Sequence, residues 1–122
     1  MTDLPLVDIR ITSEFQRKLK NLVKKYRRVS TDLQPVLEQL RRGEFLGDQI
    51  PGIGFTVMKV RIKNSDIKKG KSGGYRLIYW IASTDRVILI DIYSKSDQSD
   101  VESIEIQKVI KDFNQNSEAT NS

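Results

Sequence analysis

Apolar residues recur along the chain with two spacings, one typical of strands and the other of helices. Alternating apolar and polar positions predict strands at residues 4–11 and 55–63. Strand-length apolar stretches predict two more, at residues 75–82, where both faces are apolar, and at residues 86–93. Apolar residues three and four apart predict three helices: one that begins after Thr12 or Ser13 and keeps its apolar stripe to Tyr26, one over residues 31–42, and one over residues 99–113. This order, β-α-α-β-β-β-α, predicts an α+β fold with helices packed on an antiparallel sheet.

The connections and faces of these elements follow from turn residues and alternation. Short turns predict that the last three strands form an antiparallel meander, and glycines and a proline predict a loop over residues 46–54. Ser99 and Glu102 are spaced as a capping box for the last helix. In the strand 86–93, strict alternation places Ile92 with Ile88 on one face and Tyr93 on the other. We expect one domain over residues 1–113 and a polar, disordered tail over 114–122.

Composition narrows the chemistry that the chain can perform. The 122 residues include no cysteine and no histidine, so thiolate chemistry, histidine acid–base pairs and the usual zinc sites are excluded. Catalysis at neutral pH must therefore use Lys, Arg, Tyr, Asp or Glu. The apolar runs are strand-sized, which predicts no membrane association and a cytoplasmic location.

Positive charge is concentrated in residues 59–76. Seven cationic side chains and one acid give this stretch a charge of +6, whereas the whole chain carries +5. Alternation aligns Lys59, Arg61 and Lys63 on one strand face, and Arg76 on the next strand can approach it. Such a cation field suits a phosphodiester backbone. The polar face of the first helix is also basic and is either a solvated face or a docking surface for RNA or an acidic partner.

RNA cleavage on such a surface needs no metal and no cofactor, because the ribose 2′-hydroxyl can attack its own phosphate. Arginine stabilises the added negative charge well, and crowding of lysines makes Lys59 or Lys71 a candidate base. Glycines 73 and 74 allow close approach to a ligand, or only a tight turn. Four aromatic residues lie among the cations and could stack on bases: Tyr75, Tyr79, Trp80 and Tyr93. For Tyr79 and Trp80, packing in the core is the favoured interpretation.

The motif KVRI…GKSGGYRLIYWI…VILIDIYSKSDQSDV resembles the RelE/HigB/ParE superfamily of bacterial type II toxin–antitoxin toxins, and is most similar to the HigB-like branch of RelE-type toxins. The similarity covers most of residues 7–113 and is motif-like only over residues 59–101. It implies a compact RelE-like domain that acts as a ribosome-dependent, metal-independent mRNA endonuclease. The implied partners are the ribosome, mRNA and a cognate antitoxin that covers the active surface and can carry the complex to operator DNA.

The resemblance also implies a set of site residues. Arg76 matches a phosphate-binding arginine, and the full catalytic set is Lys59, Arg61, Lys71, Arg76, Tyr93 and Lys95. Further RNA contacts are expected from Lys63, Lys68, Lys69 and Tyr75. The chain departs from RelE at Ser96, where RelE has an arginine, and at Glu102, where RelE has a tyrosine that Tyr93 would replace. These departures leave open a weak or altered nuclease. Two other functions are alternatives, a ParE-like DNA gyrase inhibitor without RNase activity and a non-catalytic RNA- or antitoxin-binding protein.

Overall fold

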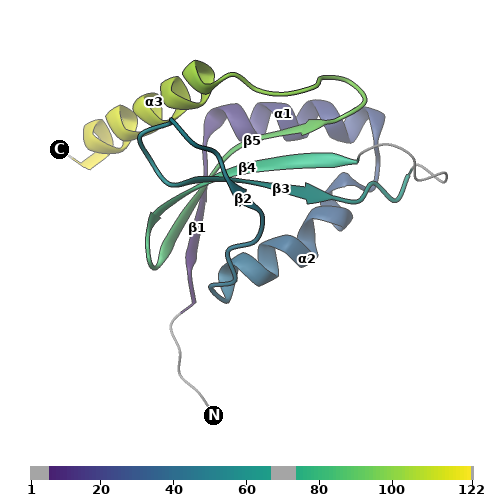
Figure 1. Ribbon diagram of the computed structural model, residues 1–122, viewed down its shortest axis with the longest axis horizontal. Coiled ribbons are helices and arrows are strands. Elements are labelled where there is room, and N and C mark those ends of the chain that lie inside the picture. Colours follow the sequence, from purple (N-terminus) through teal and green to yellow (C-terminus); the bar gives the residue numbers. More distant parts are fainter. Residues whose placement is uncertain (1–5, 67–73, 122) are drawn as a thin grey trace, which may run out of the picture.

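A five-stranded sheet in the order β1-β5-β4-β3-β2 forms the centre of the molecule (Figure 1). The computed structural model describes residues 6–66 and 74–121. Its elements are β1 (Asp8–Ile11), α1 (Ser13–Lys25), α2 (Val29–Arg41), β2 (Asp48–Gln49), β3 (Val57–Ile62), β4 (Tyr75–Ser83), β5 (Arg86–Ser94) and α3 (Ser103–Asn121). The predicted α+β class and the order of the main elements are confirmed.

The sheet is an antiparallel meander with one strand added at each edge. β3, β4 and β5 pair antiparallel, as predicted. β1 pairs with β5 in parallel, so the sheet is mixed and not purely antiparallel. The α1–α2 hairpin and the strands β2, β3 and β4 lie between β1 and β5 in sequence, and β5 then runs in the same direction as β1. The predicted loop over residues 46–54 contains β2, whose Asp48 pairs with Lys59 of β3.

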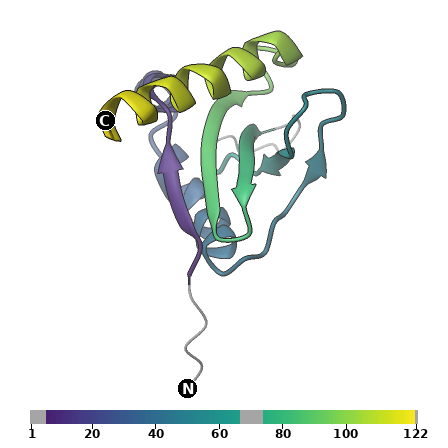
Figure 2. The ribbon, with the colours of Figure 1, turned by 90° about the vertical axis from the view of Figure 1, so that its left-hand side faces the viewer.

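Helices cover both faces of the sheet (Figure 2). On one face, Phe15 and Leu22 of α1 and Leu33 of α2 pack in one core cluster with sheet residues such as Leu77. On the other face, α3 packs in a second cluster whose members are Ile53, Val57, Ile78, Ile88, Ile90, Tyr93, Ile106 and Ile110. We call these the α1/α2-side core and the α3-side core.

Capping interactions determine where the helices begin. Thr12 caps α1, because its hydroxyl accepts from Phe15 N at 3.0 Å and donates to Leu89 O of β5 at 2.9 Å. The same side chain therefore starts the helix and attaches it to the sheet. The predicted capping box of Ser99 and Glu102 is wrong, since α3 begins at Ser103 and continues past Phe113, where the predicted helix ends.

A β-bulge in β5 changes which side chains share a face. Ile78 of β4 pairs with Asp91, but the next residue, Tyr79, pairs with Leu89, so Ile90 is an extra residue in β5. Beyond this bulge the alternation is reversed. Ile92 lies in the α1/α2-side core and Tyr93 in the α3-side core, opposite to the faces that strict alternation predicts.

Candidate active site

Three candidate residues form a row across the central strands. Arg61 of β3 pairs with Arg76 of β4, which pairs with Tyr93 of β5. Directly opposed residues lie on the same face, and neighbouring strands are about 4.8 Å apart. The predicted approach of Arg76 to the basic face of β3 is thus confirmed. The bulge in β5 is what brings Tyr93 to this face.

Lys59 extends the row on the same face of β3. It lies two residues before Arg61, and the side-chain alternation of a strand places residues this far apart roughly 7 Å from each other. Its side chain is half-buried, and its Nζ donates to Asp100 Oδ1 at 3.2 Å. The strands β3 and β4 therefore place three cationic side chains, those of Lys59, Arg61 and Arg76, around one region of the sheet. The loop after β5 supplies Asp100, which contacts the first of them.

Helix α3 and the chain before it bury Tyr93 but leave Arg61 exposed and Arg76 partly exposed. Ile106 and Ile110 of α3 pack against Ile78 and Ile90, which lie further along β4 and earlier in β5 than the row. The row lies at the end of the sheet where β3 ends and β4 begins, and the chain from β5 loops past it before α3 starts (Figure 1). Arg61 is exposed and Arg76 half-buried, so a ligand can reach both guanidinium groups.

Tyr93 is buried, with its hydroxyl on Asp100. The residue is 2% exposed, and its hydroxyl donates to Asp100 Oδ1 at 3.4 Å. Burial, with the nearby Asp100 charge as a smaller cause, raises the pKa of Tyr93 to about 12. The phenol is therefore protonated at neutral pH and acts as a hydrogen-bond donor and not as a base.

Asp100 belongs to the site although the sequence did not reveal it. Its Oδ1 also accepts from Val101 N at 2.8 Å, and this bond, followed by the contact with Lys59, lowers the pKa of Asp100. The sequence predicts only that Asp100 lies near the start of the last helix, where an acid is favourable. No local spacing connects it to Lys59, which is 41 positions away.

Lys95 and Gly74 hold the ends of β4 and β5 together. The backbone N–H of Lys95 donates to Gly74 O at 2.8 Å, and the exposed Lys95 side chain donates from Nζ to Ser99 O at 2.9 Å. Gly74 has a φ of 56°, and a Cβ there would lie 2.3 Å from Ile62 O. The glycine is thus needed for close packing of the chain on itself, which is the tight-turn alternative for this position.

Other predicted residues lie elsewhere. Tyr75 is fully buried on the α1/α2 side, where its ring makes an edge contact with Tyr26 at 5.7 Å, so its predicted stacking on a base is incompatible with its position. Tyr79 is buried as expected and donates to the Leu46 carbonyl. Trp80 packs in the α3-side core, also as expected. Lys63 is exposed just past β3, and the remaining three candidates lie outside the described residues: Lys68, Lys69 and Lys71.

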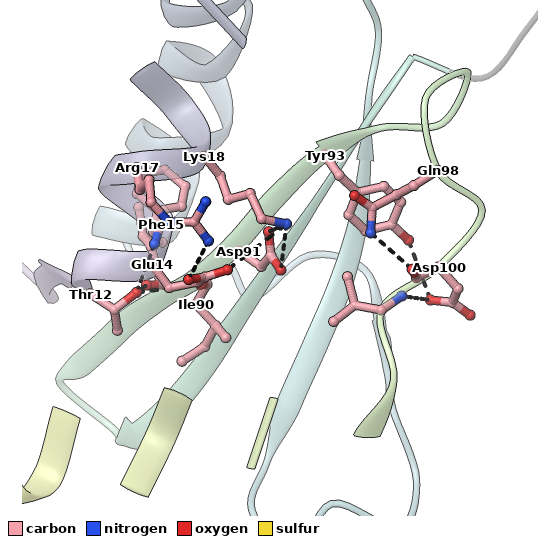
Figure 3. A network of polar contacts seen from close by, with 12 residues as sticks. Thr12, Glu14, Phe15, Arg17, Lys18, Ile90, Asp91, Tyr93, Gln98 and Asp100 are labelled. Carbon is pink, nitrogen blue, oxygen red and sulfur yellow. Dashed lines mark hydrogen bonds and ion pairs between the residues drawn. The ribbon is translucent and has the colours of Figure 1, made fainter. Parts of the chain in front are cut away.

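Part of the basic face of α1 is engaged with the protein itself. Lys18 Nζ contacts Asp91 Oδ1 at 3.2 Å, and Lys25 Nζ contacts Asp97 Oδ1 at 2.6 Å (Figure 3 shows the first pair). These two lysines attach α1 to β5 and to the loop that follows it. Lys18 and Lys25 are therefore held in ion pairs within the protein, and we do not assign them to a docking surface for RNA or an acidic partner.

The fold and the cationic row define a small α+β protein with positively charged side chains grouped on one sheet face. The family model described as the RelE toxin of the RelE/RelB toxin–antitoxin system matches residues 12–121. The chain therefore belongs to the RelE toxin family, and it is a toxin of a toxin–antitoxin system with a cognate antitoxin as its partner. A comparison with curated proteins gave no match. Within the described part of the chain, no helix is long and apolar enough to cross a membrane.

Proposed function

We propose that this toxin is a ribosome-dependent endoribonuclease that cleaves mRNA without a metal and thereby inhibits translation. The observation that carries the proposal is the row of Arg61, Arg76 and Tyr93, with Lys59 beside it, on one sheet face. A finer placement in the HigB-like branch of RelE-type toxins is part of the same proposal. Because its substrate is mRNA on the ribosome, the toxin acts in the cytoplasm.

The chemistry is an internal transesterification. The 2′ oxygen forms a bond to phosphorus while the bond from phosphorus to the 5′ oxygen breaks, which leaves a 2′,3′-cyclic phosphate and a 5′-hydroxyl. One proton leaves the 2′-hydroxyl to a base, and one is delivered to the 5′ oxygen. The transition state carries extra negative charge on the phosphoryl oxygens.

The residues of the row suit this charge. Arg76 and Arg61 are permanently cationic and can each hold two phosphoryl oxygens. Where Lys71 is the base, Lys59 stays protonated and adds a third cation. Tyr93 supplies a hydroxyl donor. We place the base at Lys59 or Lys71. Lys95 belongs to the same proposed catalytic set. Three further lysines outside the row steer the RNA towards it, namely Lys63, Lys68 and Lys69.

Arg76 provides the test of this proposal. Arg76→Gln and Arg76→Lys are expressed beside the unchanged toxin, and mRNA 5′ ends are mapped on translating ribosomes. We expect Arg76→Gln to reduce cleavage by about 10²–10³-fold, and Arg76→Lys to recover only part of it because an ammonium cannot form the two parallel hydrogen bonds. Arg86→Gln is the matched control, since Arg86 is exposed at the opposite end of β5 and pairs with Asp8.

The same experiment separates the proposal from its alternatives. Codon-phased cuts that disappear with Arg76→Gln and persist with Arg86→Gln support the nuclease. Growth arrest with intact mRNA and damaged DNA contradicts it and indicates gyrase inhibition. Toxicity that is equal in all variants, without RNA or DNA damage, also contradicts it.

A further inference from the structure

Three hydrogen-bond donors from different segments converge on one oxygen of Asp100. Lys59 Nζ of β3 lies 3.2 Å from Asp100 Oδ1, the Tyr93 hydroxyl of β5 lies 3.4 Å away, and the Val101 N–H lies 2.8 Å away. Figure 3 shows Tyr93 and Asp100 directed towards one another beside β5. A cation, a hydroxyl and a backbone N–H around one oxygen form an anion-binding site.

We propose that these three donors form a phosphate subsite of the toxin, that Asp100 occupies it in the free protein, and that a phosphate of the RNA substrate displaces the Asp100 carboxylate. The proposal rests on the nuclease function and adds a second phosphate position to it. Tyr93 belongs both to the row and to this subsite, so the subsite is next to the phosphate held by Arg76.

Burial and exposure make the exchange feasible. The donors are held in place, because Tyr93 is 2% exposed and Lys59 is half-buried on a central strand. The acceptor is not held in this way, since the Asp100 side chain is 62% exposed in the loop between β5 and α3. A rotation of this side chain towards solvent opens the subsite without moving the sheet. Phosphate oxygens then accept from the same donors.

This arrangement also distinguishes Asp100 from a general base. The three donors hold Asp100 as an anion and lower its pKa, and a carboxylate so stabilised is a weak proton acceptor. An internal competitor should hinder binding, so that its removal strengthens RNA binding. A base should have little effect on binding, and its removal should slow cleavage.

Binding of an uncleavable RNA tests the proposal. The probe is a fluorescent single-stranded oligoribonucleotide in which every ribose is 2′-O-methylated, titrated with the full chain at fixed salt. We expect Asp100→Asn and Asp100→Ala to bind it about three- to fivefold more tightly, the size of an exposed ion pair. Asp97→Asn is the matched control, because it removes the same charge from the same loop but pairs with Lys25 instead of Lys59. In a Lys59→Met background, the gain from Asp100→Asn should vanish.

A second measurement makes the subsite independent of the nuclease proposal. Inorganic phosphate is titrated while the amide resonance of Val101 is followed by NMR, and saturation is expected at a severalfold lower phosphate concentration in Asp100→Asn. That shift supports the subsite even if no RNA cleavage is found. Three outcomes would each overturn the proposal. Both Asp100 variants bind the oligonucleotide no more tightly than the unchanged protein, or Asp97→Asn gains as much affinity as Asp100→Asn, or the Val101 resonance does not shift when phosphate is added.

Discussion

Asp91 illustrates how a single ionisable residue next to the site serves the fold. It follows the bulge residue of β5 and lies two positions before Tyr93. Its side chain is 5% exposed and accepts from Lys18 Nζ at 3.2 Å (Figure 3). Burial raises the pKa of Asp91, and the charge of Lys18 opposes this increase. We therefore interpret Asp91 as the attachment point of α1 on β5.

This raised pKa makes the stability of the protein depend on pH in a defined direction. An acid with a raised pKa in the folded state contributes stability that is present below its unfolded pKa, near 3.8, and is lost as pH rises through the folded pKa. We expect the free energy of unfolding of the unchanged protein, relative to Asp91→Asn, to decrease over that window. Urea unfolding followed by the fluorescence of the single tryptophan, Trp80, measures it.

Lys18→Met serves as the companion variant. Without the ammonium, burial and the Glu14 charge raise the pKa of Asp91 against only the Ile92 backbone hydrogen bond, so the total decrease with pH should become larger. A difference between the unchanged protein and Asp91→Asn that grows with pH would show that the ion pair outweighs burial, contrary to this interpretation.

At the scale of elements, the turn into β4 depends on Gly74. A methyl group at Gly74 would meet Ile62 O at 2.3 Å, whereas one at Gly43, which also has a positive φ, would meet nothing within 4 Å. We expect Gly43→Ala to cost about 1 kcal/mol for the backbone alone, and Gly74→Ala about 2–4 kcal/mol. Denaturant unfolding of the two variants measures the difference. Equal costs would show that β3 and the turn separate easily, and that the position of Arg76 does not depend on their contact.

The elements that the sequence predicts well are those with a regular period. The strand β3 and the stripe of α1 follow from the spacing of their apolar residues, and β4 follows from a strand-length apolar run. The faces of β5 cannot be predicted from spacing, because the extra residue at Ile90 reverses the alternation. The sequence of apolar residues in this strand does not indicate the position of such a bulge. The parallel pairing of β1 with β5 also cannot be predicted from the sequence pattern. It depends on how the α1–α2 hairpin folds back on the sheet.

The candidate site was predictable where it lies on one strand or on paired strands. Lys59, Arg61 and Arg76 could be grouped from alternation and a short turn. Asp100 could not, because its contact with Lys59 depends on the path of a loop and not on any period. Tyr93 was identified as a candidate, but its face and its burial depend on the bulge and on α3.

At the scale of the whole molecule, the net charge of +5 attracts any polyanion, so binding of RNA alone does not identify the site. A defined phosphate-binding site differs from attraction by the overall positive charge in which protein cations contact RNA phosphates and release the counterions bound there. For single strands, the slope of log K against log salt concentration is about −0.7 for each phosphate neutralised. Cations that contact phosphate therefore contribute to the slope individually.

We expect Arg76→Gln and Arg61→Gln each to make this slope about 0.7 less steep for the 2′-O-methylated oligonucleotide, because each removes one phosphate contact. Arg86→Gln lowers the net charge by the same amount at the far end of β5 and should leave the slope nearly unchanged. Fluorescence anisotropy at several salt concentrations gives all four slopes. An equal change in Arg86→Gln would mean that the RNA binds the charged surface as a whole, and the row of Arg61, Arg76 and Tyr93 would then no longer define where the phosphate is held.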